Sequence, residues 1–154
     1  MAAKPTHEQA QLHLQVYDLR REERLRKARD WFGQNFYPQT FDEVSRIAPM
    51  GSEQSAFVGM VLGYWENACA LLNYGLLHEG LFFETSGEFF MVYDQIKKVL
   101  PEFRNQMGDK YMMSNLEKAA KRFETWSNKR SPGGIEKMRQ MMKPQNTKAK
   151  SAKG

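Results

Sequence analysis

The chain has 154 residues, 41% of them hydrophobic, and it carries a formal net charge of +5. This length favours one domain around one core, and the lone cysteine, Cys69, excludes an intramolecular disulfide framework. The N-terminus has no apolar run, so we expect no secretory signal and a cytoplasmic protein.

The first predicted element is a long helix from about Thr6 to Asn35. Its apolar residues fall at roughly helical spacing: Leu12, Val16, Leu19, Leu25, Ala28, Trp31 and Phe32. The segment RREER at 20–24 is polar on all sides. We therefore expect the middle of this helix to be exposed or to face a partner.

Two capping signals follow. Thr40, with Glu43 three residues later, forms a capping box that predicts a short helix over 41–48. Ser52 caps a helix over about 53–77, whose apolar stripe is Phe57, Met60, Val61, Tyr64, Trp65, Ala68, Leu71 and Leu72. Small residues on a second face indicate that this helix is central and covered on two sides.

A second capping box, Thr85 and Glu88, predicts a helix over about 86–100, which Pro101 stops or kinks. A last core helix is predicted over about 112–129. Because no alternating Val/Ile/Thr run predicts a strand, the expected fold is all-α. We expect a compact bundle of four or five helices over residues 1–130.

Residues 131–154 are predicted to form a basic, flexible tail. The segment 129–154 has a net charge of +7, whereas residues 1–128 sum to −2. Its candidate phosphate contacts are Lys129, Arg130, Lys137, Arg139, Lys143, Lys148, Lys150 and Lys153. The alternative is that a short amphipathic segment, 135–142, docks on the bundle or on a partner.

Residues 60–104 carry a resemblance to a known family. The elements that carry it are Tyr64-Trp65-Glu66, Leu71-Leu72, Gly75-Leu76-Leu77, Glu79, Pro101 and Arg104. In this order they resemble a family of small bacterial all-helical domains that has no assigned function. The resemblance implies an all-helical domain and transfers no catalytic or ligand-binding residue. Members often carry a membrane anchor ahead of the domain, where this chain has a charged helix.

Glu66 stands in the middle of the most apolar predicted helix. An unpaired, buried carboxylate would be costly, so we expect an ion pair with Arg104, with Arg46 and Arg122 as further candidates. The alternatives are a solvent-exposed carboxylate and a catalytic acid. Together with Asn67, Glu66 also interrupts the longest apolar stretch, so no membrane span is expected.

No arrangement of residues predicts a reaction. His7 and His13 are six residues apart, on different sides of a helix, and no paired cysteines are present. Cys69 lies between two alanines and is expected to be a small buried hydrophobe. We therefore predict no metal, no cofactor and no enzymatic activity.

The predicted function is a non-catalytic module for protein–protein interaction or scaffolding. The expected partner is another protein or a second copy of the chain, bound through the long N-terminal helix. The alternative is a nucleic-acid-associated protein whose basic tail makes nonspecific phosphate contacts.

Overall fold

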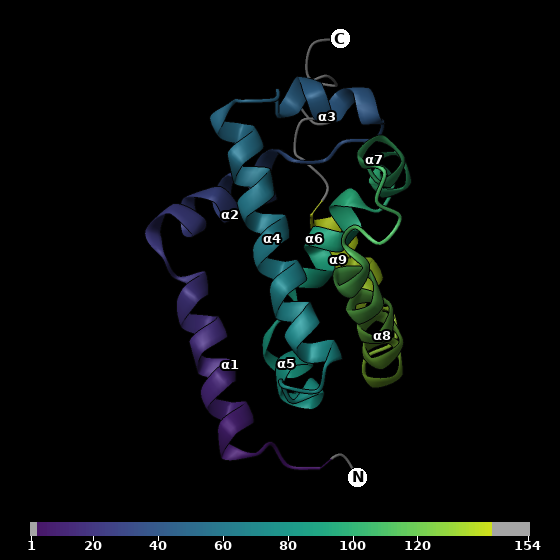
Figure 1. Cartoon of the computed structure of the whole chain (residues 1–154). Helices are drawn as coiled ribbons and strands as arrows, with labels where there is room; N and C mark the ends of the chain where they lie inside the picture. Colours follow the sequence, from purple (N-terminus) through teal and green to yellow (C-terminus); the bar gives the residue numbers. More distant parts are fainter. Residues whose placement is uncertain (1–2, 143–154) are drawn as a thin grey trace.

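The computed structural model describes residues 3–142, and within them all regular structure is helical (Figure 1). The helices are α1 (His7–Arg20), α2 (Glu23–Asn35), α3 (Phe41–Ile47), α4 (Glu53–Asn73), α5 (Glu79–Thr85), α6 (Glu88–Ile96), α7 (Leu100–Met107), α8 (Ser114–Arg130) and α9 (Gly134–Met141). The all-α fold class is confirmed. The expected count of four or five helices is wrong, because nine form within residues 3–142.

The expected first helix is divided into α1 and α2, which run in different directions (Figure 1). Glu22 causes the division, since its carboxylate accepts hydrogen bonds from the backbone N–H groups of Arg24 (3.0 Å) and Leu25 (2.8 Å) and so caps α2. Arg29 donates to the carbonyl of Arg20 at 3.2 Å and satisfies the end of α1. The polar segment at 20–24 is therefore a corner between helices.

The long helix α4 lies at the centre of the fold and packs against α2 and α8 (Figure 1). The Ser52 hydroxyl accepts a hydrogen bond from Ser55 N–H at 3.1 Å, as the sequence predicts for the cap. Two residues beyond the helix, Gly75 has a φ of +78°, and Leu76 N–H donates to Leu71 O at 3.0 Å. A left-handed residue closes this end, so the central helix stops at Asn73, four residues before its expected end.

The second expected capping box does not form. Thr85 lies inside α5 and its hydroxyl donates to the carbonyl of Leu81 at 2.7 Å, while Gly87 precedes α6 without any side-chain cap. Glu88 binds Arg29 instead. Residues 79–85 form the short helix α5, which His78 caps by accepting from Leu81 N–H at 3.1 Å.

The core is aromatic and continuous across the bundle. Its largest fully buried side chains are Trp65, Phe32, Phe36, Phe82, Phe89 and Phe90. The rings of Trp65 and Phe89 lie 6.3 Å apart, which joins α4 to α6. Trp65, from the predicted stripe, is only 1% exposed.

The C-terminal part of the described chain is packed. Residues 131–142 were expected to begin a flexible tail, but α9 packs against α8 and buries Ile135, which is 3% exposed. The alternative prediction of a docked amphipathic segment is the one that the structure supports. The turn at Gly133, with a φ of +82°, brings α9 back onto the bundle. Residues 143–154 lie outside the described residues.

Within residues 3–142, α4 is the one helix long and apolar enough to cross a membrane, judged by length and composition. The core helix of a soluble protein passes the same criteria, and 44% of the most apolar window of α4 is buried in the fold. The expectation of no membrane span stays a prediction.

Candidate functional site

Glu66 caps a helix of another part of the chain. Its Oε1 accepts hydrogen bonds from Asn115 N–H (3.1 Å) and Asn115 Nδ2 (3.0 Å), and its Oε2 accepts from Leu116 N–H at 2.8 Å. These are N–H groups of the first turn of α8, which has no capping side chain of its own because Met113 precedes it in a left-handed conformation. The carboxylate therefore satisfies free donors and faces the positive end of α8.

The expected ion pair between Glu66 and Arg104 is wrong. Arg104 lies 3.4 Å from the carboxylate of Glu117 and donates from Nε to the carbonyl of Met112 at 2.9 Å. Backbone donors stabilise this half-buried carboxylate as an arginine would. The residue types do not show that the tertiary fold brings the start of another helix to Glu66.

The two further candidates also have other partners. Arg46 pairs with Glu43 within α3, and Arg122 donates to Glu79 and to the Asn73 side chain, both at 2.7 Å. Arg122 therefore ties α8 to α5 and to the end of α4.

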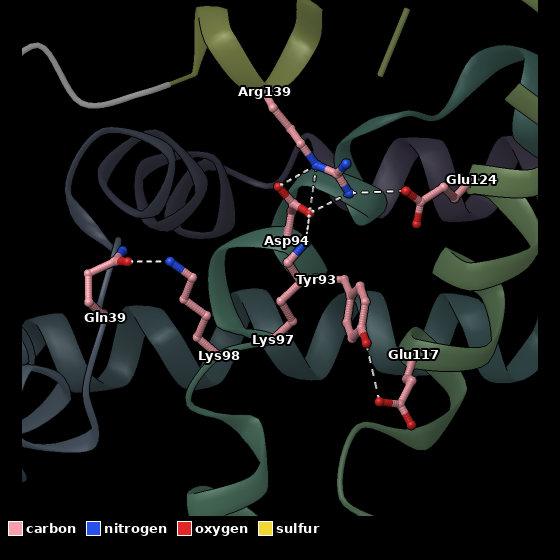
Figure 2. A network of polar contacts seen from close by, with 8 residues as sticks. All are labelled: Gln39, Tyr93, Asp94, Lys97, Lys98, Glu117, Glu124 and Arg139. Atoms are coloured by element: carbon pink, nitrogen blue, oxygen red, sulfur yellow. Dashed lines mark hydrogen bonds and ion pairs between the residues drawn. The ribbon is translucent and has the colours of Figure 1, made fainter. Parts of the chain in front are cut away.

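A cleft of about 620 Å³ lies between the link that follows α2, helix α6 and helix α9. It is lined by Tyr37, Pro38, Gln39, Glu43, Met91, Asp94, Gln95, Lys97, Lys98, Arg139 and Met142. Its volume is in the range of small-molecule sites. The cationic groups at its wall are already paired: Lys97 lies 2.7 Å from Asp94, and Lys98 donates to Gln39 at 2.6 Å (Figure 2).

Arg139 joins α9 to two other helices. Figure 2 shows its guanidinium between Asp94 of α6, at 3.1 Å, and Glu124 of α8, at 3.3 Å. The hydrogen bonds that Asp94 accepts from the guanidinium raise the pKa of Arg139. Burial alone would raise the pKa of Asp94, but the hydrogen bonds from Arg139 and Lys97 outweigh it and lower that pKa. The network ties α9 to α6 and α8 through Arg139. The phosphate contact predicted for Arg139 stays a prediction.

A second branch of polar contacts joins α6 to α8. The hydroxyl of Tyr93 donates to Glu117 at 3.2 Å (Figure 2). Glu117 also pairs with Arg104. Burial, followed by the negative charge of Glu117, raises the pKa of Tyr93 to about 12. Sequence reasoning missed these roles of Asp94 and Glu117, because the side chains that link them to other helices lie at no fixed spacing in the sequence.

The other predicted basic contacts are distributed over two helices and the end of the chain. Lys129, Arg130 and Lys137 are exposed on α8 and α9, and Arg130 lies 3.8 Å from Glu84 and over the ring of Trp126. The remaining four, Lys143, Lys148, Lys150 and Lys153, lie outside the described residues.

Among residues 3–142, no three His, Cys, Asp or Glu side chains gather in a way that could hold a metal ion. Cys69 is fully buried on α4, and this burial raises the pKa of its thiol well above the ordinary range. A thiol in this state is a poor nucleophile.

Helix α1 buries fewer of its residues against the bundle than α4 does. Val16 is its one buried residue, while Leu14 and Leu19 are 64% and 62% exposed. Tyr17 is also exposed, and the guanidinium of Arg20 lies 4.8 Å from the centre of its ring. The solvent-facing half of α1 therefore presents three large apolar side chains.

The comparisons with known proteins identify a family. A search of curated proteins and a search of solved structures find no significant match. Residues 5–123 match the family described as "Domain of unknown function (DUF4760)", and this range reaches from α1 into α8. That match agrees with the resemblance to a helical domain family with no assigned function. The match covers well over half of the chain, and the chain therefore belongs to the DUF4760 family.

Proposed function

We propose that this protein is a non-catalytic helical module that binds another protein through α1, with a second copy of the chain as the partner. The observation that carries the proposal is the exposed apolar surface of α1, which consists of Leu14, Leu19 and the solvent-accessible part of Tyr17. Single exposed apolar residues are common on protein surfaces. Three on a helix that buries only Val16 favour a surface that another chain covers.

The rigidity of the rest of the fold supports this role. Glu66 caps α8 from α4, and Arg139 ties α9 to α6 and α8, so the bundle behind α1 is cross-linked by polar contacts. A preorganised support lowers the cost of binding, since fewer groups must be ordered when a partner docks.

The test is the sedimentation of the full-length protein over a range of concentrations. We expect the sedimentation coefficient of the natural chain to rise with concentration, and the double variant Leu14→Gln, Leu19→Gln to stay monomeric. Met107→Gln is the matched control, because Met107 is 66% exposed but lies on α7. A natural chain that stays monomeric, or a control that dissociates equally, contradicts the proposal. Affinity capture from the native cell with the same variants then tests for a different protein partner.

The alternative is nonspecific binding of nucleic acid by the segment 129–154, and its supporting observation is the net charge of +7. It predicts that binding of duplex DNA by the full-length protein weakens by orders of magnitude between about 50 and 200 mM salt. Lys-to-Gln changes at Lys143, Lys148, Lys150 and Lys153 should then remove most of the binding. Binding that is insensitive to salt would contradict this alternative.

A further inference from the structure

A small cavity lies beneath α1, on the side that faces the bundle. Its volume is about 10 Å³. It is lined by His13, Val16, Tyr17 and Arg20 of α1, by Tyr64 and Trp65 of α4, by Phe82 of α5 and by Ser86. The cavity thus lies where three helices meet.

Two buried N–H groups belong to the residues that line this cavity. The Nε of Arg20 and the Nε1 of Trp65 are inaccessible to solvent, and neither has a hydrogen-bond acceptor among the described residues. Trp65 itself is 1% exposed. Buried donors in folded proteins nearly always have a partner, either a protein group or an ordered water molecule.

Two of the nearby protein acceptors already have donors. The carbonyl of Val16 accepts from the hydroxyl of Tyr64, and the carboxylate of Glu88 is shared between Arg29 and the Nη1 of Arg20. A small molecule or ion in the cavity can supply the acceptor that the two free N–H groups lack. A volume of about 10 Å³ corresponds to a single water molecule and is too small for phosphate or sulfate.

We propose that this cavity binds one water molecule, which accepts hydrogen bonds from the indole of Trp65 and the guanidinium of Arg20. The protons of the water point to the hydroxyl of Ser86 and to the imidazole of His13, which also line the cavity. A buried water commonly makes three such hydrogen bonds.

The state of His13 fits this arrangement. Burial lowers the pKa of His13, so the ring is neutral at physiological pH and one of its nitrogens can accept a hydrogen bond. Its Nε2 lies 3.3 Å from the hydroxyl of Thr85. The water joins the inner face of α1 to α4 and to the end of α5. The inference goes beyond the proposed function, because it concerns the inner face of α1 whether or not the outer face binds a partner.

Magnetization transfer from water to the indole N–H groups, measured by NMR on the full-length protein labelled with ¹⁵N, tests the proposal. We expect magnetization transfer from water to the Nε1–H of Trp65. The sign of the cross-relaxation should be that of a water molecule that tumbles with the protein. Trp31 and Trp126, which are partly exposed, are internal controls for fast bulk water. Trp65→Phe assigns the signal. If that variant does not fold, Trp31→Phe and Trp126→Phe assign it by elimination.

Absence of transfer to Trp65, or transfer with the sign of rapidly diffusing water, would overturn the proposal. A crystal structure provides the second measurement. Density for one oxygen within hydrogen-bond distance of both nitrogens supports the water site. An anomalous signal at that position would identify chloride and refute water as the ligand, and an empty cavity would refute the site itself.

Discussion

The replacement of Glu66 by Gln tests the role of this carboxylate as the cap of α8. Gln keeps the size of the side chain and one oxygen that can accept from Asn115. The second oxygen becomes an amide NH₂ group, which cannot accept the hydrogen bond that Leu116 N–H donates at 2.8 Å. The change therefore leaves a backbone donor unsatisfied and removes a negative charge at the start of α8.

The expected loss of stability follows from these two effects. Removal of a capping acceptor costs about 1 kcal/mol, and loss of the charge at a helix N-terminus costs a further ~0.3–1 kcal/mol. The N–H group of Leu116, which is partly buried, then lacks an acceptor, and this increases the loss of stability further. We expect Glu66→Gln to lower the free energy of unfolding by about 2 kcal/mol, or Tm by about 4–8 °C for a chain of this size.

Urea denaturation followed by circular dichroism measures the change. The control is Glu53→Gln, since Glu53 lies in the first turn of the same helix, is half exposed and makes only a 3.5 Å contact with Lys27. We expect the control to stay within about 0.5 kcal/mol of the natural protein. If Glu66→Gln is no less stable than Glu53→Gln, the carboxylate does not cap α8 and the reasoning is refuted.

Three further predictions concern the core and α9. Trp65→Ala should cost about 3–5 kcal/mol, as large aromatic deletions from cores do, and a loss below about 1 kcal/mol in a thermal melt would contradict its place in the core. Arg139→Met should cost about 1 kcal/mol and speed amide exchange at Ile135, whereas unchanged exchange would show that the ion pairs do not hold α9. Because its contacts with Arg139 and Lys97 lower the pKa of folded Asp94 below the unfolded value of about 3.9, its contribution to stability is present above that value and is lost as pH falls through the folded pKa. Asp94→Asn should therefore lose less stability on acidification below about pH 4 than the natural protein, and an identical acid titration would exclude this linkage.

Local signals in the sequence determined the fold class and several helix ends. Thr6 and Gln9 form a reciprocal capping box at the start of α1, and Ser52 starts α4 where its side chain predicts. Caps and glycine turns are interactions within three to five residues, so the residue types alone contain them. The apolar stripe of α4 likewise predicts a core position for Trp65, because helical periodicity places such residues on one face.

Two helix boundaries could not be predicted from local signals in the sequence. Glu22 has no pattern that distinguishes it from the other charged residues of the segment 20–24, yet it caps α2 and divides the first helix. Thr85 and Glu88 match a capping box, but Glu88 gains a bidentate pair with Arg29, 59 residues earlier, at 2.7 and 2.5 Å. A charge-assisted pair of this kind is stronger than a local cap, and only the tertiary structure brings Arg29 close.

The candidate site was decided almost wholly by the tertiary structure. The sequence indicates that Glu66 needs a partner, because a carboxylate on an apolar helix cannot be buried alone. Its partner is the start of α8, about 50 residues later, and backbone N–H groups carry no mark in the sequence. The docking of α9 depends in the same way on Asp94 and Glu124, which come together only after α6 and α8 have packed. Residue types alone determined which groups require partners, whereas long-range packing determined which partners they receive.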